Sequence, residues 1–131
     1  MTPIHAPADV TPLPVSVRVP TRRACENFAL KIAGHTVHIT IERDAAGRLF
    51  GAWVDMHKEG APVRGMLNII ARLVSLCIQS GIPVTRIARH LGAAPFEPAG
   101  DVSDYEGPTE IASATSVADL LGRVLLAEDK R

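Results

Sequence analysis

The chain has few aromatic residues and no excess of charge of either sign. Its 131 residues include three phenylalanines, one tryptophan and one tyrosine. Fourteen basic side chains balance fourteen acidic ones. Single-strand nucleic-acid binders usually stack bases on several aromatic rings, and broad attraction to nucleic acid or anionic membranes requires net positive charge. Neither nucleic acid nor a membrane is therefore expected as a partner of the chain as a whole. Arg86 and Arg89 could still form a local basic patch, so a nucleic-acid adaptor is kept as a less favoured interpretation.

Cysteine is equally scarce, and long apolar runs are missing. Cys25 and Cys77 are far apart and belong to no CxxC motif or disulfide framework. We find no apolar run of the length that spans a bilayer, and the first residues lack the basic and apolar regions of a secretory signal. These features predict a protein of the reducing cytoplasm.

The reactive side chains form no recognised catalytic or metal-binding motif. His35 and His38 lie three apart on a predicted strand and should point to opposite faces, and the other histidines are scattered, so no metal site is expected. Cys77 falls on the apolar stripe of a predicted helix and is expected in the core. Cys25 follows two arginines, which leaves open a reactive thiol or a plain thiol at a strand entrance.

The pattern of apolar residues predicts one α+β domain over residues 15–127, with a disordered tail at 1–14 and a short tail at 128–131. Period two predicts strands and helical spacing predicts helices. The predicted strands are 15–19, 28–32, 36–42 and 49–56, and the predicted helices are 62–80, 83–91 and a third from 113 or 116 to 127. Residues 93–111 are predicted to be a long loop. The expected fold is an antiparallel meander of three or four strands with one face covered by three helices.

Two surface features are candidates for binding. The sheet face opposite the helices should carry polar residues of the 36–42 strand together with Trp53, and an exposed tryptophan there would indicate a homodimer surface. Arg22 and Arg23 form a basic corner, and Lys58-Glu59-Gly60 precedes a helix whose N-terminus could offer backbone donors to an anion. Charged turns kept in water are an equally good interpretation of these residues.

Several short motifs follow one another along residues 16–126. They are Arg18-Val19-Pro20-Thr21-Arg22-Arg23, Gly34-His35, Lys58-Glu59-Gly60, Gly81-Ile82-Pro83-Val84, Phe96-Glu97-Pro98-Ala99-Gly100 and Ala114-Thr115-Ser116-Val117-Ala118-Asp119. Taken in this order, they resemble the TSCPD domain at the C-terminal end of adenosylcobalamin-dependent (class II) ribonucleotide reductases. The five-residue motif that names the family is absent, because residues 111–116 contain no cysteine. The redox-active cysteine pair at the end of the full reductases is also missing before Arg131.

The resemblance implies a role in ribonucleoside-diphosphate reduction for DNA synthesis. Such reductases use a thiyl-forming cysteine and a reducing pair, whereas this chain has two isolated cysteines. We therefore expect an accessory or regulatory domain that is not catalytic alone and that acts with a catalytic reductase chain carrying adenosylcobalamin. The alternative is a nucleotide- or small-molecule-binding module without a reductase partner. The candidate ligand-binding residues are Arg22, Arg23, Lys58, Glu59, Gly60, Phe96, Pro98 and Gly100.

Overall fold

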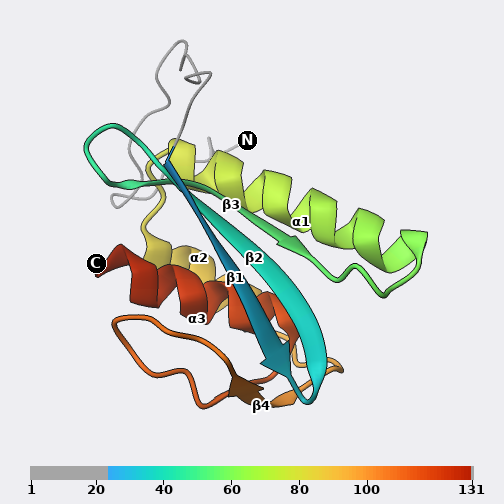
Figure 1. Cartoon of the computed structure of the whole chain (residues 1–131). Helices are drawn as coiled ribbons and strands as arrows, with labels where there is room; N and C mark the ends of the chain where they lie inside the picture. The colour runs from blue at the N-terminus through green and yellow to red at the C-terminus, as the bar shows by residue number, and fades with distance from the viewer. Residues whose placement is uncertain (1–23, 131) are drawn as a thin grey trace.

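The computed structural model describes residues 24–130, which form a curled antiparallel sheet and three helices (Figure 1). The predicted strand at 15–19 and the basic corner of Arg22 and Arg23 lie outside the described residues. The elements in chain order are β1 (Ala24–Ile32), β2 (His35–Arg43), β3 (Leu49–Asp55), α1 (Ala61–Gln79), α2 (Val84–Leu91), β4 (Gly100–Ser103), β5 (Ser113–Ala114) and α3 (Val117–Asp129).

The predicted meander is confirmed by the pairing of β1, β2 and β3. β1 and β2 pair without interruption from Ala24–Arg43 to Ile32–His35. Their turn consists of Ala33 and Gly34, with φ of 49° and 82°, a left-handed conformation that glycine adopts at little cost and that suits a two-residue hairpin. β2 and β3 pair antiparallel with a register shift between Glu42 and Arg43.

The sheet has five strands, with the order β3-β2-β1-β4-β5, where three or four were predicted. The two additional strands come from the end of the chain. β4 lies within the segment predicted to be a loop and pairs with β1 at Lys31–Ser103 and Ile32–Val102, and β5 pairs with β4. Strands of four and two residues are too short to show a clear period-two pattern, which is why the sequence did not indicate them.

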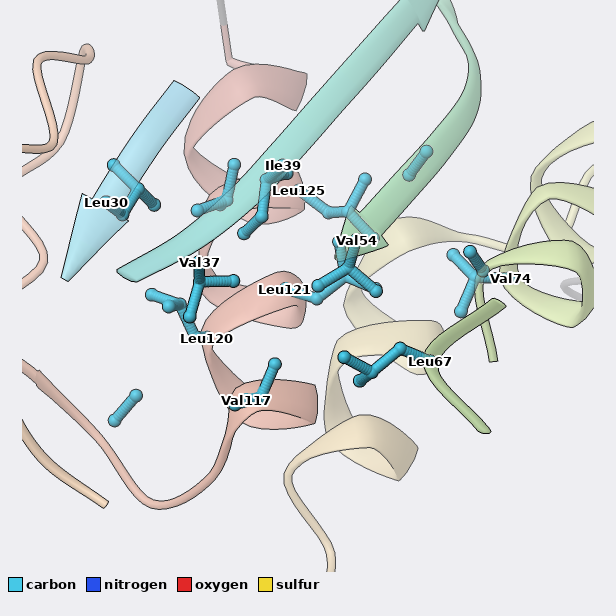
Figure 2. Packing of buried hydrophobic residues seen from close by; sticks show 14 of the residues in the cluster. Leu30, Val37, Ile39, Val54, Leu67, Val74, Val117, Leu120, Leu121 and Leu125 are labelled. Atoms are coloured by element: carbon cyan, nitrogen blue, oxygen red, sulfur yellow. The ribbon is translucent and has the colours of Figure 1, made fainter. Parts of the chain in front are cut away.

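The core lies between the inner face of the sheet and the helices, as expected for the α+β class. Figure 2 shows Leu30, Val37, Ile39 and Val54 of the strands packed with side chains of α1 and α3. The labelled helical partners are Leu67, Val74, Val117, Leu120, Leu121 and Leu125. The fully buried aliphatic side chains of β1 and β2 alternate with more exposed ones, so the predicted period-two pattern places the correct face inward.

α1 also covers the outer edge of β3. The hydroxyl of Ser75 accepts a hydrogen bond from the backbone N–H of Ala52 and donates one to its carbonyl oxygen, both at 3.0 Å. Gln79 Nε2 donates to the carbonyl oxygen of Phe50 at 3.2 Å. An uncovered strand edge is a template for pairing with another chain, so these side chains protect β3.

α3 begins with a side-chain cap and runs past its predicted end at 127. The Ser116 hydroxyl accepts from the N–H of Asp119 at 2.9 Å, the contact by which a serine caps a helix N-terminus. The helix continues to Asp129, and Glu128 is fully buried. The carboxylate of Glu128 accepts from Tyr105 at 2.7 Å and pairs with Arg43 at 3.4 Å, which ties the helix end to the 103–111 segment and to β2.

α1 differs from the prediction in two ways. Met66 and Leu73 have the helical spacing that predicts the same apolar stripe as Cys77, but they are 59% and 57% exposed. Among residues 24–130, α1 is also long and apolar enough to cross a membrane, judged by its length and its mean hydropathy of 1.4 alone. The expectation that the chain has no such segment was wrong. Its packing on β3 through Ala71 and Ser75 shows a helix bound to a sheet.

Candidate functional site

A polar hollow lies on the outer face of the sheet, between β2, β3 and the first half of α1. Its volume is about 720 Å³. This size falls within the range of sites that bind one small molecule. The residues that line it are Asn27, His38, Thr40, Trp53, Val54, Asp55, His57, Glu59, Ala61, Arg64, Gly65 and Asn68.

The strand register brings the polar side chains of this hollow together. His38 lies opposite Asp55, and Thr40 lies opposite Trp53, so all four side chains project from one face. This places Trp53 on the face where the sequence predicted it. Trp53 is half-buried, and its indole N–H donates to the carboxylate of Glu42, which is only 6% exposed.

A charged pair forms the wall of the hollow next to α1. Arg64 donates from Nε to Asp55 Oδ1 at 3.0 Å and from its terminal nitrogen to Oδ2 at 2.9 Å. This two-point contact fixes the geometry of both groups. The hydrogen bonds and charge of Arg64 hold the pKa of Asp55 below its ordinary value, and His57 lowers it further. The same contact raises the pKa of Arg64.

Two histidines meet at the hollow although they are nineteen positions apart in the sequence. The rings of His38 and His57 pack edge to face with centroids 4.5 Å apart. His57 Nε2 is 3.7 Å from Asp55 Oδ2, so an imidazole, a carboxylate and a guanidinium form one row. The sequence predicted His38 on a strand with His35 and placed His57 among the scattered histidines, so this contact was not predicted. The available signal was weak: His38 occupies an outward strand position, and His57 follows the end of the neighbouring strand.

The arrangement is suited to hydrogen bonding with a polar ligand. Thr40 donates to Asn27 Oδ1 at 2.5 Å, and Asn68 on α1 completes the amide groups around the hollow. Within residues 24–130, no group of three or more His, Cys, Asp or Glu side chains is placed to hold a metal ion. The groups present can donate and accept hydrogen bonds, and the imidazoles can also exchange protons.

Six of the eight predicted ligand-binding residues lie within the part of the chain that the structure describes, and they fall into two places. Glu59 lines the hollow, Lys58 is exposed beside it, and Gly60 is the N-cap residue of α1. Phe96, Pro98 and Gly100 lie at the other side of the sheet, next to β4 and β5, where the Phe96 N–H donates to the carbonyl oxygen of Thr115 at 3.0 Å. β2 and β1 stand between β3 and β4, a separation of about 14 Å at ordinary strand spacing.

The two cysteines also lie on different elements. Cys25 is exposed near the start of β1, and Cys77 is half-buried near the end of α1. The two are not joined by a disulfide. Cys77 packs against the core, close to its predicted position.

The fold and the site together define a class of protein. It is a small α+β domain with helices on one face of the sheet and a polar hollow on the other. The TSCPD domain family matches residues 11–128, nearly the whole chain. The chain therefore belongs to the TSCPD domain family, as the motifs predicted.

Similar proteins of known name are vitamin B12-dependent ribonucleotide reductases. The chain is 35% identical over 108 residues to the one from Agrobacterium fabrum and 36% identical over 108 residues to the one from Bradyrhizobium diazoefficiens, which is 82% of this chain and 8% of each relative. The relative from Streptantibioticus cattleyicolor is 27% identical over 125 residues, 92% of this chain and 20% of its own length. The chain thus corresponds to one small domain of these enzymes. No solved structure matches it.

Proposed function

We propose that this chain is an accessory or regulatory domain of a vitamin B12-dependent ribonucleotide reductase system. It would assist a catalytic reductase chain that reduces ribonucleotides to deoxyribonucleotides for DNA synthesis, and that chain would bind adenosylcobalamin. The observation that carries the proposal is the match of 82% of the chain to a segment that makes up 8% of two such reductases, together with the family match over residues 11–128. A cytoplasmic location remains a prediction.

The positions of the thiols support a non-catalytic role for the chain by itself. Cys25 lies on β1, and Cys77 lies on α1 beside α2, so they are not gathered in the polar hollow. The hollow has the size of a site for one small molecule, and a corrinoid cofactor together with a nucleotide needs more room.

The test is an activity assay with and without a catalytic chain. The purified chain is incubated with adenosylcobalamin, a dithiol reductant and each ribonucleotide, alone and with the Agrobacterium fabrum reductase lacking its matched 108 residues. We expect no deoxynucleotide from the chain alone and an increase in product when both are present. As a control, the double variant Cys25→Ser, Cys77→Ser should give the same increase. Product formed by the chain alone would refute the proposal.

A second candidate function is binding of a nucleotide or other small molecule without a reductase partner. The polar hollow favours it, with Trp53, Asn68 and the two histidines as ligand contacts and Lys58 beside it for a phosphate. A ligand that binds only the folded state raises the melting temperature. A nucleotide-dependent shift that His57→Ala abolishes and Lys31→Ala retains, with no effect of the chain on the truncated reductase, would establish this alternative.

A further inference from the structure

The side of α1 that faces away from β3 is apolar. Four large side chains form the outer stripe of α1 and are 54–59% exposed: Met66, Ile69, Leu73 and Leu76. Their spacing is three, four and three residues, which keeps them on one side of the helix. This is the spacing of alternating a and d positions, the pattern by which one helix packs along another.

The outer stripe continues into a groove between α1 and α2. Leu73 belongs to both, and the groove has a volume of about 510 Å³. Its other apolar walls come from Cys77 on α1 and from Ile82, Ile87 and Leu91 at or near α2. The concave shape gives a bound helix contacts on two sides, as in the helix-in-groove mode of recognition.

The segment that forms this surface carries formal charges of one sign in its sequence. Residues 60–96 contain four arginines and no aspartate or glutamate. Arg64 is paired with Asp55, while Arg72 on α1 donates to the neutral amide oxygen of Asn68 and has no carboxylate partner within residues 24–130. On the other side of the stripe, Arg86 and His90 line the groove.

We propose that the outer stripe and the α1–α2 groove bind an amphipathic helix with acidic flanks, belonging to the catalytic reductase chain. The identity of the partner rests on the proposed function, and the chemistry of the occupant rests on the apolar spacing and the basic rim. A second copy of this chain fits less well, because pairing two such surfaces would place arginines against arginines. A lipid surface would use the exposed stripe but would leave the groove without a matching ridge.

The chemistry of the surface can be tested without the reductase. The probe is a designed helical peptide with leucines at a and d and glutamates at e and g, and its binding is followed by fluorescence anisotropy. We expect binding that weakens with added salt and falls about tenfold or more in Leu73→Glu and in Arg72→Glu. Matched controls are Ala46→Glu and Lys31→Glu, at exposed positions that belong to neither the outer stripe nor the groove, and these variants should bind like the unchanged chain. Equal binding of a lysine-flanked peptide would overturn the charge argument.

The partner is tested with the Agrobacterium fabrum reductase lacking its matched segment, by titration calorimetry. Binding lost in Leu73→Glu and kept in Ala46→Glu supports the proposal. Reductase binding that Leu73→Glu leaves unchanged refutes this surface and leaves the proposed function standing. Peptide binding without reductase binding refutes the proposed function and the identity of the partner, while the acidic-helix chemistry of the surface stands.

Two further measurements separate the other occupants. Sedimentation of the isolated chain over a concentration series would reveal a dimer, and a dimer dissociated by Leu73→Glu would overturn the assignment to a different partner. Flotation with vesicles of phosphatidylcholine and phosphatidylserine would reveal lipid binding. If the unchanged chain binds vesicles but not the peptide, and Leu73→Glu abolishes the vesicle binding, the assignment to an acidic helix is likewise overturned.

Discussion

Removing the hydroxyl of Ser75 should destabilise the protein far more than its size suggests. In Ser75→Ala, both the N–H and the carbonyl oxygen of Ala52 lose their partner beneath α1, where Ser75 is only 7% exposed. A buried polar group left unpaired costs about 1–3 kcal/mol, so two such groups should lower the free energy of unfolding by about 2–4 kcal/mol. For a domain of this size, that change corresponds to a melting temperature lower by roughly 10–15 °C.

The measurement is urea unfolding followed by circular dichroism and by the fluorescence of Trp53, which lies on the same strand as Ala52. Ser80→Ala is the matched control, because the Ser80 hydroxyl donates only to the carbonyl oxygen of Leu76 within an exposed turn at the helix end. We expect the control to change the free energy of unfolding by less than about 0.5 kcal/mol. Equal effects of the two substitutions would refute the idea that Ser75 secures the edge of β3.

Three other substitutions should change stability: two glycine replacements with effects of opposite sign, and one aspartate replacement whose effect depends on pH. Gly122→Ala would place a Cβ 3.1 Å from Ala88 Cα where α2 crosses α3, so thermal unfolding should show a loss of about 1–3 kcal/mol, whereas Gly65→Ala has open space and should gain about 0.5–1 kcal/mol. Burial alone would raise the pKa of Asp119, but hydrogen bonds from Arg123 and the backbone lower it below its ordinary value. The contribution of the Asp119 carboxylate to the free energy of unfolding should be complete above about pH 4 and lost on further acidification. Urea titrations from about pH 6 to pH 2 should therefore show a smaller decline in that free energy for Asp119→Asn than for the unchanged protein. An equal decline would contradict this assignment.

The main part of the fold could be predicted because its patterns are long. β1 and β2 each have nine residues, and their alternating apolar side chains are long enough to identify the buried face. The end of α3 was predicted at 127, with residues 128–131 as a short tail. The fully buried Glu128 is instead stabilised by Tyr105 and Arg43, partners that are 23 and 85 positions away. Sequence periodicity contains no information on such distant contacts.

The candidate site was only partly predictable for the same reason. The face that carries His38 and Trp53 followed from the strand pattern, because alternate residues of paired strands share a face. The meeting of His38 with His57 depends on the path of the chain after β3, and the pairing of Asp55 with Arg64 depends on the angle at which α1 leaves the sheet. Local propensity fixes neither of these.

α1 shows why an apolar pattern does not by itself locate the core. Its buried residues Leu67, Ala71 and Val74 have helical spacing, and so do the exposed residues of the outer stripe on the opposite side. A helix that is apolar on two sides needs two partners, and β3 supplies one of them through Ser75. The second side faces outward among residues that carry only positive charge, from position 60 to position 96. An acidic helix bound on that side would remove the apolar side chains from water and at the same time neutralise the arginines beside them. Neither a second copy of the chain nor an uncharged surface can do both.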